Sequence, residues 1–174
     1  MRKFLITLTI FFTLAIPAFA QSVAVSADEY DKIKIAALYQ NLNVASQNLP
    51  GVNLSVDYKI TGFGRWCLGA VVDGAFQHDT NKVVDRYQIL GGPQVSYLVG
   101  DRISVFGRGL FGATRFDQQS VRLKDFSRVT VGVGGGLDIH FGHFFVRPAQ
   151  FDFQFIDERP VRYTRFGAGG GYRF

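Results

Sequence analysis

Apolar and polar residues alternate along most of the chain. The clearest stretch is residues 52–60, VNLSVDYKI, where every second residue is apolar and every residue between is polar. Successive side chains of a β-strand point to opposite faces. This stretch therefore predicts a strand with one apolar and one polar face.

The same alternation predicts seven further strands. They are expected within residues 32–42, 66–77, 86–98, 103–114, 128–141, 144–156 and 165–174. A few apolar residues share the polar face, namely Leu38, Leu42, Phe106 and Leu110. Arg147 breaks the parity just before Pro148, and proline within a sheet marks an edge or a bulge. We expect a bulge that returns Arg147 to the polar side.

The predicted connections alternate in length. Residues 61–65, 100–101 and 142–143 are short, whereas 43–51, 78–85, 117–127 and 157–160 are mostly longer and more polar. Short turns at one rim and longer loops at the other are typical of outer-membrane barrels, whose strands need about 9–11 residues to span. Residues 32–174 are therefore predicted to form an all-β, eight-stranded, antiparallel up-and-down transmembrane β-barrel.

The first 20 residues have the three parts of a secretory signal peptide. A basic start, Met1-Arg2-Lys3, precedes the apolar run 4–16, and the small residues Ala18 and Ala20 precede Gln21. A membrane-spanning helix needs about 20 apolar residues, which argues against the alternative of an N-terminal anchor helix. Cleavage before Gln21 would leave residues 21–31 as a short periplasmic lead-in, and the expected location is the outer membrane.

Alternation alone does not say which face points outward. A soluble eight-stranded barrel, such as a lipocalin, places its apolar face inward. The signal peptide and the many glycines on the polar face favour the reverse, because a crowded lumen needs small residues. Aromatic residues near strand ends on the apolar face predict the girdles of a membrane barrel. These are Tyr39, Tyr58, Trp66, Tyr97 and Phe141.

Composition narrows the chemistry. Of 174 residues only 19% are charged, and the net charge of +5 has no clustered Lys/Arg run, so a nucleic-acid partner is not expected. The single cysteine, Cys67, excludes an internal disulfide framework. No pattern of residues calls for a cofactor.

Ionisable residues on the polar face are the main candidate site. Their members are Lys34, Asp57, Lys59, Asp73, Arg86, Arg108, Asp138, Asp152, Arg165 and Arg173. The interior of an eight-stranded barrel is just wide enough for side chains to fill, and buried charges must be paired. We interpret the set as a salt-bridged polar core, with a narrow pore or a catalytic carboxylate as alternatives.

Three smaller motifs are weaker candidates. Residues 107–112 match G-x-G-x-x-G, but the alternation continues where a nucleotide site would need a helix. His140 and His143 lack further metal ligands and are expected to be a rim pair without metal. His78 could serve a lipid-modifying enzyme at the rim together with Ser120 or Ser127, although no spacing motif supports this.

Several segments resemble the small OmpA-like and OmpX-like outer-membrane barrels. They are GVNLSVDYKITGFGRWCLGAVVDGAF, ILGGPQVSY, FGRGLFGATRF, GGGLDIHFGHFFVRPAQFDF and the final GAGGGYRF. The resemblance implies that Phe166, Tyr172 and Phe174 form the C-terminal signal read by the outer-membrane assembly machinery. The barrels of this family lie in the lipid of the outer membrane, so the resemblance implies the same surroundings for this chain.

The predicted function is a structural or interaction role, through membrane integrity or through binding by the surface loops. A small ion or solute channel is the alternative function. A lipid-modifying enzyme with its site at the rim is the least favoured of the three. We expect a monomer. The sequence does not identify an extracellular partner.

Overall fold

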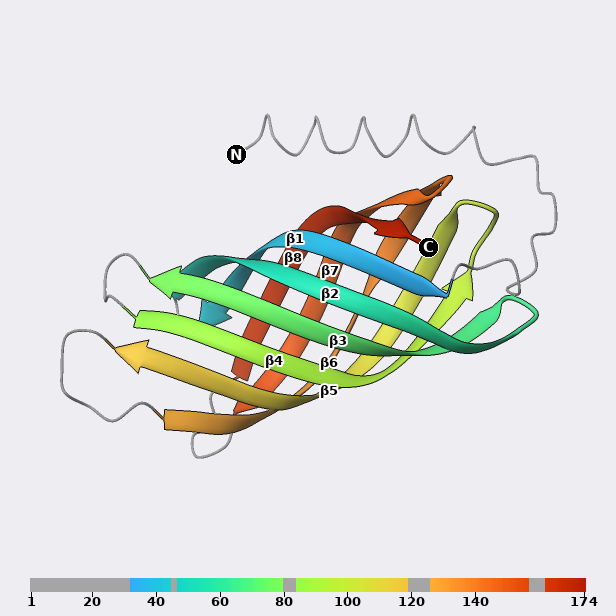
Figure 1. Ribbon diagram of the computed structural model, residues 1–174. Coiled ribbons are helices and arrows are strands. Elements are labelled where there is room, and N and C mark those ends of the chain that lie inside the picture. Colours follow the sequence, from blue (N-terminus) through green and yellow to red (C-terminus); the bar gives the residue numbers. More distant parts are fainter. Residues whose placement is uncertain (1–31, 45–46, 80–83, 119–125, 157–161) are drawn as a thin grey trace, which may run out of the picture.

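Eight strands make up the described part of the chain. The computed structural model describes residues 32–44, 47–79, 84–118, 126–156 and 162–174 (Figure 1). No helix in these ranges is long and apolar enough to cross a membrane. The strands are β1 (Ile33–Val44), β2 (Gln47–Phe63), β3 (Trp66–Asp79), β4 (Val84–Leu98), β5 (Ile103–Gln118), β6 (Phe126–Phe141), β7 (Phe144–Ile156) and β8 (Arg162–Arg173).

Each strand pairs antiparallel with its neighbours in sequence, and β8 pairs with β1 to close the barrel (Figure 1). The closing register places Ile35 opposite Tyr172 and Gln40 opposite Gly167. Closure leaves no unpaired strand edge, as a bilayer requires. The predicted eight-stranded antiparallel barrel is confirmed. The predicted signal peptide and lead-in lie outside the described residues.

The strands at the long-loop rim extend further than predicted. Residues 43–51 were expected to be a loop, but Asn43 pairs with Asn48 and Val44 with Gln47. His78 likewise pairs with Asp85 inside the predicted connection 78–85. Backbone ladders do not require apolar side chains, so pairing continues after the alternation ends. Loop lengths read from hydrophobicity alone were therefore too long.

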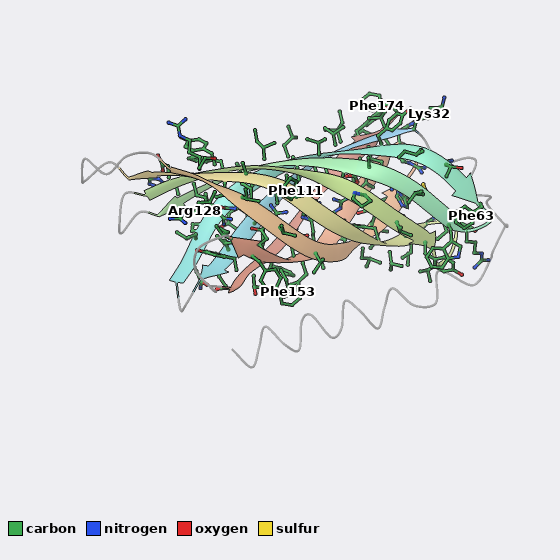
Figure 2. All side chains as sticks on the ribbon, turned by 90° about the horizontal axis from the view of Figure 1, so that it is seen from below. Lys32, Phe63, Phe111, Arg128, Phe153 and Phe174 are labelled. Carbon is green, nitrogen blue, oxygen red and sulfur yellow. The ribbon has the colours of Figure 1, made fainter. Side chains whose placement is uncertain are left out.

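The polar face lines the interior. On β2, Asn53 and Asp57 are 3% and 6% exposed, whereas Val52 and Leu54 are 57% and 55% exposed. Apolar side chains such as Phe111 and Phe153 point away from the barrel wall (Figure 2). The arrangement is the reverse of a soluble ligand-binding barrel.

The bulge predicted at Pro148 is present. The pairing of β7 with β8 shifts register between Arg147 and Gln150, and Arg147 is fully buried in the lumen. The β6–β7 pairing shifts between Leu137 and Ile139, beside Asp138. The two irregularities bring an arginine and an aspartate to the interior at the same level.

Interior glycines on β6 and β8 make room for large side chains from neighbouring strands. A Cβ added at Gly136 would lie 2.7 Å from the Phe106 ring, and one at Gly171 would lie 2.6 Å from the Phe145 ring. A Cβ added at Gly134 would collide with the carboxylate of Asp152. The glycines therefore set where bulky and charged side chains fit in the lumen.

Candidate functional site: the charged lumen

Two arginines and two aspartates form a closed square of ion pairs in the middle of the lumen, here called the central cluster. It consists of Asp73 on β3, Arg108 on β5, Asp152 on β7 and Arg165 on β8. Each arginine contacts both carboxylates, at N···O distances between 2.8 and 3.0 Å. All four side chains are nearly inaccessible to solvent. Formal charges balance within the cluster.

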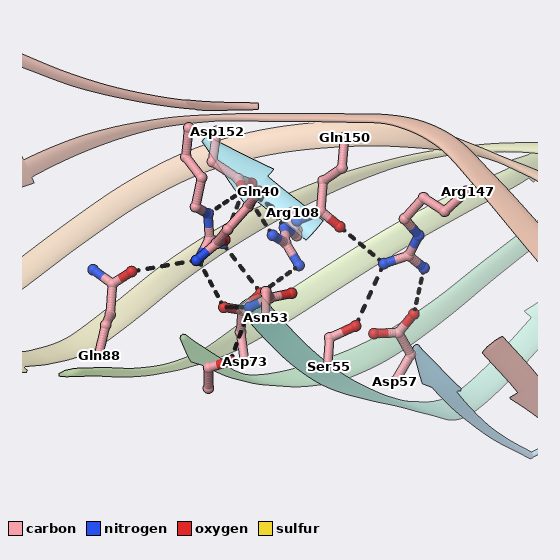
Figure 3. A network of polar contacts seen from close by, with 12 residues as sticks. Gln40, Asn53, Ser55, Asp57, Asp73, Gln88, Arg108, Arg147, Gln150 and Asp152 are labelled. Carbon is pink, nitrogen blue, oxygen red and sulfur yellow. Dashed lines mark hydrogen bonds and ion pairs between the residues drawn. The ribbon is translucent and has the colours of Figure 1, made fainter. Parts of the chain in front are cut away.

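Neutral side chains complete the hydrogen bonding of the central cluster (Figure 3). Asn53 Nδ2 donates to Asp73 Oδ1 at 2.6 Å, and Gln150 Nε2 donates to Asp152 Oδ2 at 3.3 Å. Arg165 Nη1 donates to Gln88 Oε1 at 3.4 Å. A buried ion pair is stable only when such bonds satisfy its remaining polar atoms.

A second group of charges, the inner cluster, lies toward the short-turn rim. It consists of Lys34, Asp57, Asp138 and Arg147. Arg147 contacts Asp138 at 2.7 Å and Asp57 at 3.0 Å, and Lys34 contacts Asp138 at 3.5 Å. The Arg147 guanidinium also lies 4.3 Å from the centre of the Phe106 ring, which adds a cation–π contact.

An outer polar layer continues the network toward the long-loop rim. Arg86 Nη2 donates to Gln154 Oε1 at 3.0 Å and stacks over the Tyr163 ring. Gln154 and Gln88 bond to each other, and Gln88 donates to Thr114. The layer therefore relies on amides and hydroxyls around one cation.

Single side chains join these three groups. Gln150 accepts from Arg147 and donates to Asp152, which connects the inner and central clusters (Figure 3). Gln88 accepts from Arg165 and so connects the central cluster to the outer layer. A continuous polar network thus follows the barrel from Lys34 to Arg86.

Eight of the ten predicted lumen residues are buried inside the barrel, and two lie nearer the rim. Lys59 faces inward at the short-turn mouth and is partly exposed. Arg173 is also partly exposed, and its Nε donates to the Gly142 carbonyl in the β6–β7 turn. The prediction that Arg173 belongs to the lumen core is wrong, because β8 ends at this rim and the side chain turns to the neighbouring turn.

Several residues of the network were absent from the predicted set. Arg147 was expected to return to the polar face but was not included, although it contacts both carboxylates of the inner cluster. Gln88, Gln150 and Gln154 occupy polar-face positions in the alternation, which was the available signal. Charge does not single out these neutral side chains among the other polar-face residues.

The two histidines at residues 140 and 143 do not form a rim pair. His140 is buried, and its Nε2 lies 2.8 Å from Ser104 Oγ. His143 lies in the turn and stacks on Tyr172. Within the described ranges, no group of three or more His, Cys, Asp or Glu residues could hold a metal ion.

The rim candidate His78 contacts Asp85, with 2.5 Å between Nδ1 and Oδ1, on the outer surface of the barrel. Ser127 is on β6, and two strands separate it from β3. At a strand spacing of about 4.8 Å, the side chains of His78 and Ser127 are about 14 Å apart, far beyond hydrogen-bond reach. Ser120 lies outside the described residues. Among the described candidates, the histidine has a carboxylate partner but no nucleophile beside it.

The predicted girdle residues lie on the outer surface. Trp66 and Tyr97 are cross-strand partners near the short-turn rim, with ring centroids 4.8 Å apart. Tyr58 and Phe141 are exposed at the same end, and Tyr39 lies further along β1. Phe174 also points outward (Figure 2), and its ring lies 4.8 Å from that of Tyr172. Aromatic side chains therefore surround the short-turn end of the barrel.

Comparison with solved structures places this fold among small outer-membrane barrels. Neisserial surface protein A has a TM-score of 0.61 at 14% identity, covering 82% of this chain and 96% of its own. Ail, the attachment invasion locus protein of Yersinia pestis, has a TM-score of 0.54 at 19% identity, with the same coverages. The outer membrane enzyme PagL has a TM-score of 0.55 at 13% identity, covering 81% of this chain and 99% of its own.

These likenesses define the class: a closed, eight-stranded, antiparallel β-barrel with the fold of small outer-membrane proteins. No family model matches the sequence. No curated protein matches it either. The class includes both a surface protein and an enzyme, so the fold alone does not assign a reaction.

Proposed function

We propose that this chain is a monomeric outer-membrane barrel whose role is structural or interactive, with a lumen closed by its polar core. The apolar outer surface and the shared fold support the membrane location. The extracellular ends of the strands, with the loops between them, would present the interaction surface. Membrane integrity or partner binding would then depend on the folded barrel and not on transport through it.

The observation that carries this proposal is the continuous network through the lumen. The central cluster connects β3, β5, β7 and β8 across the interior, and each of its charges is matched. Opening a path would separate buried charges, which costs several kcal/mol per uncompensated ion. A conducting state is therefore strongly disfavoured.

Biogenesis forms part of the same proposal. Cleavage between Ala20 and Gln21 would release the barrel into the periplasm, and the assembly machinery would read the C-terminal aromatics. The mutually packed rings of Tyr172, near the end of β8, and of the exposed Phe174 that follows it support that reading. Deletion of Phe174 is the direct test of the signal, measured as the amount of folded protein in outer-membrane fractions.

A conductance measurement distinguishes a closed barrel from a channel. Residues 21–174, refolded from urea into detergent and placed in a planar bilayer, are expected to give no steady current steps. A shift in gel mobility between unboiled and boiled samples verifies that the barrel is folded. The doubly substituted Asp73→Ala/Arg108→Ala barrel is the comparison, because it removes one acid and one base from the central cluster. Ion-selective steps in the unsubstituted protein would overturn the proposal in favour of a channel.

Lipid analysis separates the closed barrel from a rim enzyme. Deleting the gene is expected to leave the structure of lipid A unchanged while increasing sensitivity to detergents and bile salts. His78→Ala should restore detergent resistance as well as the unsubstituted gene does. A lipid A species that changes on deletion and is not restored by His78→Ala would point to the enzyme.

A further inference from the structure

A small cavity opens at the short-turn mouth of the lumen, beside the inner cluster. Its volume is about 20 Å³, which is room for one or two water molecules. Asp57 on β2 belongs to its lining and also to the inner cluster. Cys67 and Gly69 on β3 and Gln94 and Ser96 on β4 line it from the side of the barrel wall. The cavity therefore separates the inner cluster from β4.

The strand register explains why space remains here. Gly69 pairs with Lys59 on β2 and with Gln94 on β4, so the three residues form one row across the wall. The middle residue of this row has no side chain to fill the lumen between its neighbours. A Cβ added at Gly69 would lie 2.5 Å from the Tyr58 carbonyl oxygen, so the backbone excludes a larger residue at this position.

Two oxygens in the lining lack a hydrogen-bond donor. Among the described residues, no group donates to Oδ1 of Asp57 or to Oε1 of Gln94. Both residues are only 6% exposed. The other carboxylate oxygen of Asp57 contacts Arg147 Nη2 at 3.0 Å (Figure 3). A buried acceptor left without a donor loses the solvation it had in water, and the loss is larger for a charged group. Both oxygens therefore need a donor within the cavity.

The chemistry of the lining restricts what this donor is. The amide of Gln94 can turn over about its last side-chain bond, which places its N–H₂ group in the cavity in place of its oxygen. Asp57 accepts hydrogen bonds, whereas the Ser96 hydroxyl both donates and accepts. A bare metal ion donates no hydrogen bond, and a fully ionised anion only accepts them. A water molecule does both, and it fits the volume.

We propose that this cavity binds an ordered water molecule that bridges Asp57 and Gln94. The water would donate to Asp57 Oδ1 and bond to the Gln94 amide. The ion pairs of the inner cluster connect β1, β2, β6 and β7, and the bridge would extend that network to β4. A bridging water is nearly as favourable in enthalpy as a direct hydrogen bond. The inference goes beyond the role proposed for the barrel and holds whether or not the barrel conducts.

NMR measures the water directly. In the refolded barrel, the side-chain amide protons of Gln94 are expected to show a cross-peak at the water frequency. A sign that changes between the laboratory frame and the rotating frame distinguishes a bound water from proton exchange. Gln154 is the internal control, because its Nε2 donates to Gln88 Oε1 at 3.2 Å and both residues are buried. Absence of the cross-peak at Gln94, or an equal one at Gln154, would overturn the proposal.

A lining variant and a change of buffer identify what holds the molecule. Cys67→Ala removes the thiol from the lining but neither oxygen of the bridge, so the cross-peak at Gln94 should persist. Replacing sodium by tetramethylammonium in the buffer should also leave it unchanged. Loss of the cross-peak without sodium would assign the site to a hydrated metal ion. Loss in Cys67→Ala would show that the bridge does not depend on Asp57 and Gln94.

The stability of Gln94→Met tests the bridge by its sign. Methionine has a similar length but no polar group. If the cavity were dry, the variant would remove an unsatisfied buried amide and raise the urea midpoint. With the bridge, Asp57 loses its bound water and the midpoint should fall. A rise would overturn the proposal.

A double-mutant cycle tests whether Asp57 and Gln94 act together. The losses from Asp57→Ala and Gln94→Met should be less than additive, because either change breaks the same bridge. Asp138→Ala is the matched change, since Asp138 also binds Arg147 but does not line the cavity. Its loss should add to that of Gln94→Met. Additivity in both pairs would contradict the bridge.

Discussion

The central cluster and the His78–Asp85 pair both join basic and acidic side chains, but they differ in burial. In the central cluster, two arginines meet two aspartates, and each cation contacts both anions where water scarcely reaches. On the outer surface, His78 is about half exposed and contacts the single carboxylate of Asp85. A buried charge that loses its partner stays unsolvated, whereas water can replace the partner of an exposed one.

Breaking the buried central cluster is expected to have the largest effect. Asp152→Ala leaves Arg108 and Arg165 without one of their two carboxylates, in a site that water scarcely reaches. Removing one partner of a buried ion pair costs about 3–5 kcal/mol. Urea unfolding of the detergent-refolded barrel, followed by the fluorescence of Trp66, measures the loss.

The control for that experiment is Asp85→Ala. It breaks the His78–Asp85 pair, whose histidine is about half exposed. Exposed pairs contribute about 0–1 kcal/mol, so the urea midpoint should move little. If Asp152→Ala and Asp85→Ala shifted the midpoint equally, the central cluster would not be the main polar stabiliser.

Adding a methyl group to the tightly packed lumen should cause a smaller loss of stability. The new methyl group in Gly134→Ala would collide with the Asp152 carboxylate and displace it from its arginines. Overpacking of this kind costs about 1–3 kcal/mol. Gly109→Ala is the matched change, since the nearest atom to its new Cβ is 3.9 Å away on Pro93. Unfolding curves of Gly109→Ala should coincide with those of the unsubstituted protein, and a similar loss in both variants would contradict the packing argument.

The barrel could be predicted from the sequence because a bilayer imposes one rule on every strand: side chains that face lipid are apolar, and those between them face the lumen. Alternation alone assigned residues such as Asp57 and Val56 to opposite faces, and Pro148 marked the bulge that turns Arg147 inward. Partners could not be predicted, because ion pairs such as Asp73–Arg165 depend on the stagger between strands that are not neighbours. Rim residues were equally hard to place: for Lys59 and Arg173, the parity is correct, but their depth depends on where each strand ends.

The order of assembly follows from the meander that closes β1 on β8. Each strand pairs with the next one in sequence, so seven hairpins can form locally, whereas closure must bring together residues such as Ile35 and Tyr172 from the first and the last strand. Loop-closure entropy delays such distant contacts. Asp73 and Arg165, 92 residues apart, can then meet only when the last seam forms. Interactions made after the rate-limiting barrier slow unfolding without speeding folding. The central cluster would therefore lower the unfolding rate of the finished barrel and leave its folding rate unchanged.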